Sequence, residues 1–314
     1  MTSVQPPVDA PVAPPPRLTT TVPREYVHRA SLAEVFLTAC TQQDGTRFEL
    51  TGQWPRAHTF FQSADGREHD PLLVAETFRQ TGLFLAHAEL GVPLGHHFVM
   101  RDLTFAVQLH RLSVGLTPTD ITLTAVCSEI NRRGRTTSGF RMDLTLRRDG
   151  VVLATGGGQF TCVAPAVYRR LRGPVADRST AEPSVRAHER SAAGRLGPSD
   201  VVLSSTARPN RWLLTPDPCH PVLFDHAGDH LPGMVLLEAA RQAATRCHAV
   251  HPMRPAAIST TFDRYAELDS PCWIEVTPLP TRERAFAAVR VTGRQENQEV
   301  FSSVVSGPRP SAVG

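Results

Sequence analysis

Two stretches of the chain are nearly continuous in apolar residues over a helical length, and the same polar trio interrupts each of them. The first, DPLLVAETFRQTGLFLAHA, covers residues 70–88, and the second, PGMVLLEAARQA, covers residues 232–243. Each contains a Glu, an Arg three positions later and a Gln directly after the Arg. Residues three and four apart are neighbours on a helix surface. We therefore expect each trio to lie together on one side of a buried helix.

After each predicted helix, apolar and polar residues alternate with the period of two that is typical of half-buried strands. The alternation covers residues 121–130 in the first half and 272–279 in the second. A hairpin follows in each half, at 139–160 and at 284–307, and Asp149-Gly150 is a favourable turn for the first. We predict an α+β fold of two repeats, each with one central helix wrapped by an antiparallel sheet.

The two halves match each other at a single register. A shift of 162 positions relates the following pairs: Glu76 and Glu238, Arg79 and Arg241, Gln80 and Gln242, His58 and His220. Four polar identities at one spacing indicate an internal duplication. We expect the two repeats to pack side by side as a pseudo-dimer.

Composition divides the chain into repeats and connecting segments. Residues 1–23 form a Pro-rich tail that we expect to be disordered or extended, and residues 168–200 form a polar linker rich in Arg, Ala and Pro, at whose start a short helix remains open. The N-terminal repeat then spans 24–167 and the C-terminal repeat 201–307, with a short tail at 308–314.

Overall composition is that of a soluble globular protein, with 41% hydrophobic and 20% charged residues. The net charge of +3 comes without Arg runs interleaved with aromatic residues, so we expect no nucleic-acid partner. No segment reaches the ~18 apolar residues of a membrane span, and no signal peptide is present, so we expect a cytoplasmic protein. The six cysteines lack zinc-site spacing, and we predict no metal. All 33 basic residues are arginine, so anions must be held by Arg, His or backbone amides.

The helix at 232–243 resembles the central helix of hydroxyacyl-ACP dehydratases of the hotdog fold, in which a Glu on that helix works with an upstream His. Across both halves the chain is more similar to the A-factor biosynthesis (AfsA) family, the γ-butyrolactone synthases. The segments that carry this resemblance are YVHRASLAEVF (26–36), HDPLLVAETFRQTGLFLAH (69–87), GVPLGHHF (91–98), HPVLFDHAGDHLPGMVLLEAARQA (220–243) and FDRYAELDSPCWIEV (262–276). The resemblance covers nearly the whole chain apart from the tail and the linker, and it implies a double hotdog fold.

The resemblance also implies an acyltransferase that moves a β-ketoacyl group from acyl carrier protein to the hydroxyl of dihydroxyacetone phosphate. The product leads to a γ-butyrolactone, or a related butenolide or furan, that regulates antibiotic production. No bound cofactor is implied, because the acyl group arrives on the phosphopantetheine arm of the carrier. Arg-rich runs at 131–135 and 168–172 are candidate contacts for that acidic partner. The chain would be a monomeric pseudo-dimer or a homodimer.

Two other classes of function remain open for this sequence. One is a thioesterase or dehydratase of the same fold, which would use water or a β-hydroxyacyl substrate instead of the phosphorylated alcohol. The other is a non-catalytic acyl-ligand sensor, in which the polar residues only bind. The duplicated Glu speaks against the sensor, because binding an acyl chain requires no buried carboxylate.

Acyl transfer to an alcohol needs a base, donors for the oxyanion and a fixed acceptor. We assign the base to Glu238, because a carboxylate among apolar neighbours is expected to have a raised pKa. Arg241 either binds the acceptor phosphate or keeps Glu238 ionised, which would lower that pKa. The N–H of Gly233, at the start of the helix, is a candidate oxyanion donor. The first repeat lacks this glycine, so we prefer the Glu238 site to one built on Glu76.

In hotdog dimers the His and the acid of one site come from opposite subunits. By that analogy Glu238 would pair with His58, and Glu76 with His220. The candidate substrate contacts are Arg79, Gln242 and His230, the last of which follows Asp229. For Gln242 and Gln80 we favour a simpler role, a hydrogen bond to the backbone.

Overall fold

The computed structural model describes residues 18–177, 195, 197–247 and 253–309. Its strands form one sheet in the order β1-β2-β4-β5-β6-β3-β9-β12-β11-β10-β8-β7, and all neighbouring strands are antiparallel. The strands are β1 (Leu37–Asp44), β2 (Arg47–Trp54), β3 (His97–Val107), β4 (Thr119–Arg133), β5 (Thr136–Arg148), β6 (Val151–Val163), β7 (Leu203–Ser205), β8 (Arg211–Leu214), β9 (Ala257–Phe262), β10 (Trp273–Leu279), β11 (Phe286–Gln295) and β12 (Gln298–Pro308). The α-helices are α1 (Leu72–Ala88), α2 (Pro165–Arg172) and α3 (Gly233–Cys247), and the short 3-10 turns are η1 (Arg24–Val27), η2 (Leu32–Glu34), η3 (Leu109–Arg111), η4 (Gly173–Asp177) and η5 (Pro198–Asp200).

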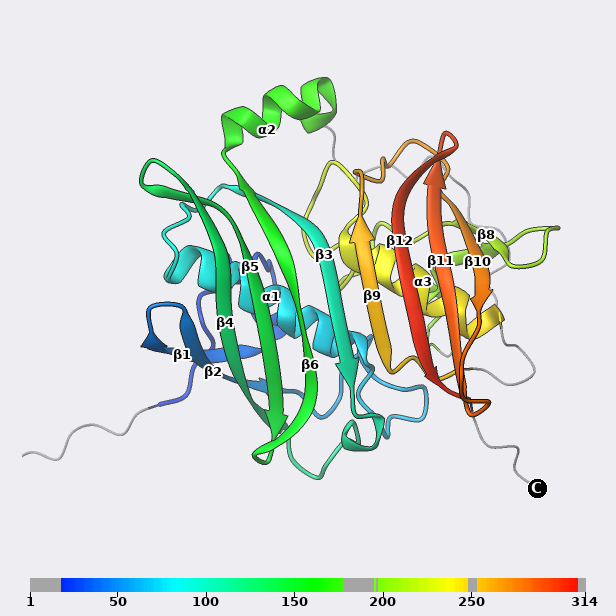
Figure 1. Ribbon diagram of the computed structural model, residues 1–314, viewed down its shortest axis with the longest axis horizontal. Helices are drawn as coiled ribbons and strands as arrows, with labels where there is room; N and C mark the ends of the chain where they lie inside the picture. The colour runs from blue at the N-terminus through cyan, green and yellow to red at the C-terminus, as the bar shows by residue number, and fades with distance from the viewer. Residues whose placement is uncertain (1–17, 178–194, 196, 248–252, 310–314) are drawn as a thin grey trace, which may run out of the picture.

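The sheet joins two halves of similar construction. Strands β1 to β6 accompany α1, and strands β7 to β12 accompany α3. The halves meet where β3 pairs with β9, from Asp102 opposite Thr261 to Ala106 opposite Ala257. Figure 1 shows α1 and α3 on the same face of the continuous sheet, and the two helices contact each other. The predicted architecture, one helix against antiparallel strands in each half, is confirmed.

The central helices are buried almost all round, as their near-continuous apolar sequence requires. The sheet can approach α1 closely because β6 carries glycine where its neighbours press in. A Cβ atom at Gly156 would lie 2.1 Å from the carbonyl oxygen of Thr104 and 2.8 Å from the ring of Phe78 on α1. Any side chain there would disturb both the pairing of β3 with β6 and the packing of β6 on α1.

The predicted hairpins are present as β5–β6 and β11–β12. The first turns at Asp149 and Gly150, with φ values of 53° and 74°, as Asp-Gly in a tight hairpin requires. The sequence analysis missed the hairpin β1–β2 and the short strands β7 and β8, which precede the helices.

Part of the predicted linker is packed structure. Helix α2 has Pro165 in its first turn and stops at Gly173, which adopts φ 57°. Arg195 and Asp200, also within the predicted linker, are buried. Residues 1–17 of the predicted tail, most of the linker (178–194 and 196) and residues 310–314 lie outside the described part of the chain. In the described part, no helix has the length and apolar character to cross a membrane.

Candidate active site

The predicted trio on α1 is the centre of a buried ion cluster. Glu76 is fully buried and accepts hydrogen bonds from Arg79 Nε (2.8 Å) and Nη2 (2.8 Å) and from Gln80 Nε2 (2.7 Å). A second arginine, Arg29 from the segment before β1, reaches the same carboxylate with Nη2 at 2.8 Å. The Nε atom of Arg29 donates to the same carboxylate at 3.1 Å, so two arginines and a glutamine converge on Glu76.

The trio on α3 repeats this cluster. Glu238 is fully buried and accepts from Arg241 Nε (2.9 Å) and Nη2 (2.7 Å) and from Gln242 Nε2 (2.6 Å). Here the second arginine is Arg195, with Nε at 2.8 Å and Nη2 at 2.5 Å. The duplication seen in the sequence is therefore also a duplication of geometry.

The raised pKa predicted for Glu238 is wrong. Burial alone would raise it, but the guanidinium groups of Arg195 and Arg241 outweigh burial and hold the pKa of Glu238 well below its ordinary value. In the same way, Arg29 and Arg79 overcome burial and lower the pKa of Glu76 to about 2. Both carboxylates are therefore ionised anchors for arginines at neutral pH, and Glu238 loses the property for which it was chosen as the base.

Each cluster is completed by a loop from the opposite half. Arg29 Nη1 donates to the carbonyl of Val222 (3.0 Å) and lies 3.9 Å from Asp225. Arg195 Nη1 lies 3.0 Å from Asp70 and also bonds the carbonyl of Phe60. Two arginines and two carboxylates thus meet in each cluster, and their formal charges cancel. The halves were predicted to contribute a histidine to each other's site. Each half does contribute a loop to the other's cluster, but the side chain that makes the contact is an aspartate.

His58 and His220 are not the crossing residues. The Nδ1 atom of His58 accepts from the backbone N–H groups of Phe60 and Phe61, both at 3.0 Å, and its Nε2 is 3.3 Å from Glu34. His220 is held in the same way, by backbone N–H groups at 3.2 and 3.0 Å on Nδ1 and by Asp200 at 3.1 Å on Nε2. Because both ring nitrogens are occupied, each histidine fixes the shape of its own loop.

The two glutamines tie the clusters to the segments that precede the sheet. Gln80 accepts from the N–H of Phe36 (3.0 Å) and donates to the carbonyl of Glu34 (2.7 Å). Gln242 makes the equivalent bonds to Val202 (3.2 Å) and Asp200 (2.8 Å). The backbone role that we favoured for both residues is thus present.

The two clusters differ in their access to solvent. The side chain of Arg79 is 18% exposed, and its Nη1 has no partner among the described residues. The side chain of Arg241 is 8% exposed, and Arg195 beside it is 1% exposed. The Glu76 cluster therefore presents a cation that can reach a ligand, whereas the Glu238 cluster is closed.

Asp225 and Asp70, the aspartates that reach the cluster of the other half, each have a histidine as a neighbour in the sequence. These two histidines also differ in their exposure to solvent. His226, which follows Asp225, has a side chain that is 58% exposed, with Nδ1 3.6 Å from the Asp225 carboxylate. The surrounding protein and the charge of Arg79 lower the pKa of His226, so its ring is neutral near pH 7. The histidine beside the other of these aspartates, His69 next to Asp70, is buried against Trp54 with Nε2 3.2 Å from Thr119 Oγ1. Only the Glu76 cluster has an exposed histidine at its edge, within the described chain.

His230 belongs to a separate polar group at the entrance to α3. Its Nδ1 lies 2.6 Å from Asp229, which also accepts from Tyr168 Oη (2.8 Å) and Arg172 Nε (2.9 Å) of α2. Gly233, the predicted oxyanion donor, begins α3 and is exposed there. Neither residue enters the Glu238 cluster.

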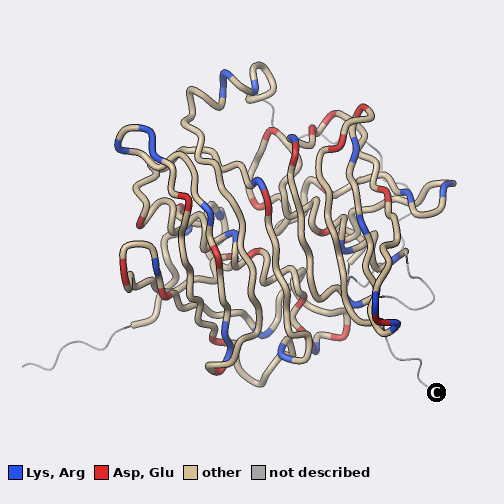
Figure 2. The backbone as a smooth tube through the Cα atoms, viewed as in Figure 1, with Lys and Arg blue, Asp and Glu red and all other residues tan. Residues whose placement is uncertain are grey.

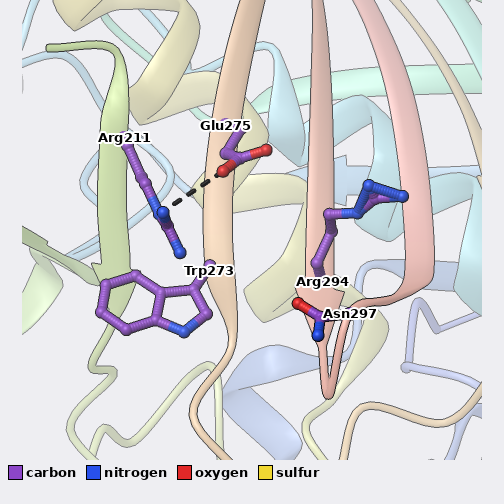
Figure 3. A pocket seen from close by; sticks show the side chains of 5 residues that line it. All are labelled: Arg211, Trp273, Glu275, Arg294 and Asn297. Atoms are coloured by element: carbon purple, nitrogen blue, oxygen red, sulfur yellow. Dashed lines mark ion pairs between the residues drawn. The ribbon is translucent and has the colours of Figure 1, made fainter. Parts of the chain in front are cut away.

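A hollow on the other face of the sheet is unrelated to both clusters. Figure 3 shows it between β8, β10 and the β11–β12 turn, lined by Arg211, Trp273, Glu275, Arg294 and Asn297. Arg211 lies over the indole of Trp273 at 4.4 Å and is 3.4 Å from Glu275. The arginine is thus already engaged within the protein.

The sequence analysis missed five residues of the clusters: Arg29, Asp70, Arg195, Asp225 and His226. The doubled Asp-His pair in DHAGDH, residues 225–230, was a usable signal, because an Asp beside a His orients the ring. Arg195 had no such signal, since it lies alone in a polar segment that resembled a linker.

The fold and the clusters define a class of protein: two hotdog repeats fused in one chain, with a buried Arg–Glu–Arg cluster on the central helix of each. The model of the A-factor biosynthesis hotdog domain matches residues 12–164 and 176–304. The chain belongs to this family.

Individual proteins agree with the family match. A 2-oxo-3-(phosphooxy)propyl 3-oxoalkanoate synthase from Streptomyces virginiae is 48% identical over 295 residues, covering 94% of this chain and 100% of the relative. The synthase of the same name from Streptomyces coelicolor is 40% identical, covering 91% of each chain. Among solved structures, the 12:0-ACP thioesterase from Umbellularia californica aligns with a TM-score of 0.49 and 14% identity over 84% of this chain and 94% of that one.

Proposed function

We propose that the chain transfers a 3-oxoalkanoyl (β-ketoacyl) group from the thioester of an acyl carrier protein to the hydroxyl of dihydroxyacetone phosphate. The names of its relatives describe the ester that this reaction makes. We place the reaction at the Glu76 cluster. The observation that carries this placement is the partly exposed side chain of Arg79 together with the exposed side chain of His226, a combination that has no equivalent at the described Glu238 cluster.

The transfer needs one proton to move and one bond to be exchanged. The acceptor hydroxyl gives its proton to Nε2 of His226 while its oxygen attacks the thioester carbonyl carbon. The carbon–sulfur bond then breaks, and the same proton passes to the departing thiolate, which leaves as the free thiol of the phosphopantetheine arm. The Asp225 carboxylate lies 3.6 Å from Nδ1, near enough to stabilise the charge that the ring gains, and the neutral state of His226 suits it to begin as a base.

Arg79 holds the acceptor. Its Nε and Nη2 are fixed by Glu76, which leaves Nη1 in a defined direction for a phosphate oxygen. Glu76 and Arg29 are then positioning residues, since they touch Arg79 and the crossing loop. A cation fixed before binding costs less entropy than one that must be ordered by the ligand.

The test uses purified protein, a β-ketoacyl carrier protein and dihydroxyacetone phosphate, with the products identified by mass spectrometry. We expect ester that requires dihydroxyacetone phosphate. His226→Gln is expected to lower kcat by about 10²- to 10⁴-fold, the usual contribution of a general base, with folding unchanged because the side chain is exposed. The matched control is His110→Gln, which makes the same change at an exposed histidine that belongs to neither cluster.

Two outcomes would contradict the proposal. Release of free acid at a rate independent of dihydroxyacetone phosphate would make the protein a thioesterase. Full activity of His226→Gln would leave the reaction in place but move it away from this cluster.

A further inference from the structure

Helix α2 has one face fixed to the second half of the protein and another left open. On the fixed face, Tyr168 Oη donates to Asp229 (2.8 Å), and Arg172 bonds both Asp229 (2.9 Å) and Glu267 (2.6 Å). The ring of His97 stacks on Tyr168, with 3.6 Å between the ring centroids. An eight-residue helix needs such anchors, because helices this short are not stable alone in water.

The open face of α2 is basic with one apolar side chain. Arg169 and Arg170 are exposed and form no ion pair with any described residue, and Leu171 is 69% exposed. The helix projects beyond the ends of the strands (Figure 1), and basic residues lie along it (Figure 2). An exposed leucine next to two arginines that have no ion-pair partner among the described residues is suited to a partner that is acidic with a small apolar contact.

The anchored face places this helix close to the proposed site. Asp229, which holds α2, is three residues from His226 in the same loop. Three residues of chain span at most about 11 Å. The Asp229 anchor of α2 therefore lies closer to His226 than the length of an extended phosphopantetheine arm.

We propose that the open face of α2, formed by Arg169, Arg170 and Leu171, is the docking surface for the acyl carrier protein. The arginines meet acidic side chains of the carrier, and Leu171 contacts its apolar residues. The inference rests on the proposed function for the choice of partner, and it adds the surface that receives it. Tyr168 and Arg172 are the positioning residues that keep this surface next to the site.

The first measurement compares two thioesters of the same β-ketoacyl group, one on the holo carrier protein and one on N-acetylcysteamine. The double variant Arg169→Glu/Arg170→Glu is expected to lower kcat/KM for the carrier thioester by about tenfold or more, since each repulsive contact replaces an attractive one. With the small thioester, which needs no docking, its kcat/KM is expected to equal that of the wild type. In the wild type, with dihydroxyacetone phosphate saturating, the carrier reaction is expected to slow more than the small-thioester reaction as salt is raised.

The matched control is Arg208→Glu/Arg290→Glu, which makes the same change of charge at exposed positions of the second half. We expect it to leave both thioesters unaffected. An equal loss in the two double variants would make the effect one of net charge and overturn the docking surface. Unchanged use of the carrier by Arg169→Glu/Arg170→Glu would overturn it as well.

Binding of a fluorescently labelled holo carrier protein separates this inference from the proposed reaction. Weaker binding by Arg169→Glu/Arg170→Glu alone supports docking at α2 even if no ester is formed. Ester formation from the small thioester supports the reaction even if carrier binding is unchanged. Leu171→Ser, which keeps the charges, is expected to weaken carrier binding without changing its salt dependence.

Discussion

At the scale of single residues, the Glu on each central helix is an anchor for arginines. Its charge is balanced inside the protein, since Glu238 meets Arg195 and Arg241, and Asp70 lies 3.0 Å from Arg195. Removing one member of a buried ion cluster leaves the others uncompensated in a medium of low dielectric constant. The stability of the protein should therefore depend on Glu238 even though this residue lies outside the cluster at which we place the reaction.

Glu238→Gln is expected to lower the free energy of unfolding by about 3–5 kcal/mol, the usual loss when a buried ion pair is broken. The measurement is urea unfolding at neutral pH. Glu275→Gln is the control, because its pair with Arg211 is partly exposed and such pairs contribute about 1 kcal/mol or less. Equal losses in the two variants would show that the buried cluster is no more stabilising than a surface pair.

Stability is expected to fall in acid as Glu76 takes up a proton. Its pKa is about 2 in the folded chain, against 4.5 without the fold, so its ionised form stabilises the fold fully above pH 4.5. This contribution, on the order of 3 kcal/mol, is lost as the pH falls from 4.5 to about 2. Urea midpoints measured across that range should decline, and Glu76→Gln should show a shallower decline. Parallel curves for the two proteins would rule out this role for Glu76.

At the scale of elements, α1 depends on a glycine that its own helix propensity disfavours. A Cβ at Gly82 would lie 2.5 Å from Cζ of Phe160, which is buried on β6. Glycine in a helix interior costs about 1 kcal/mol relative to alanine. Its presence here indicates that close packing between α1 and the sheet outweighs that cost.

Gly82→Ala is therefore expected to lower the melting temperature, because overpacking costs about 1–3 kcal/mol. Adding Phe160→Leu, which removes the ring from that space, should recover part of the loss. Gly45→Ala, where no atom lies within 4 Å of the added Cβ, should have little effect. A rise in melting temperature for Gly82→Ala would mean that propensity dominates at this position.

The helices and hairpins could be predicted because their signals are local. Periodicity marks α1 and α3, and Asp149-Gly150 marks the β5–β6 turn within a few residues of sequence. The partners of Glu76 and Glu238 could be predicted only in part. Arg79 and Arg241 are one helical turn away, but Arg29 and Arg195 arrive from segments 47 and 43 residues distant. No spacing rule of a single sequence identifies contacts of that kind.

At the scale of the whole molecule, the two halves are fastened to each other at several places. They share the β3–β9 pairing, and each buried cluster takes an aspartate and a backbone carbonyl from the other half. Neither half can unfold without breaking buried ion pairs in the other. We therefore expect one cooperative unfolding transition for the chain.

Tryptophan fluorescence can test this cooperativity, because Trp54 lies in the first half and the other tryptophans, Trp212 and Trp273, lie in the second. Trp54→Phe leaves probes only in the second half, and Trp212→Phe/Trp273→Phe leaves one only in the first. In each variant the fluorescence transition in urea should coincide with that of far-UV circular dichroism. Separate midpoints for the two halves would contradict the prediction.

The fusion of the halves has a consequence for how such a protein can diverge. When two identical subunits form a dimer, every substitution appears twice, so both interfaces must change together. In this chain the counterparts Arg79 and Arg241 are encoded separately, and the side chain of Arg79 is more exposed than that of Arg241. A fused gene can thus keep the contact between the halves at one cluster unchanged while the other cluster changes and acquires a new ligand. Two identical subunits cannot change one copy of a site alone.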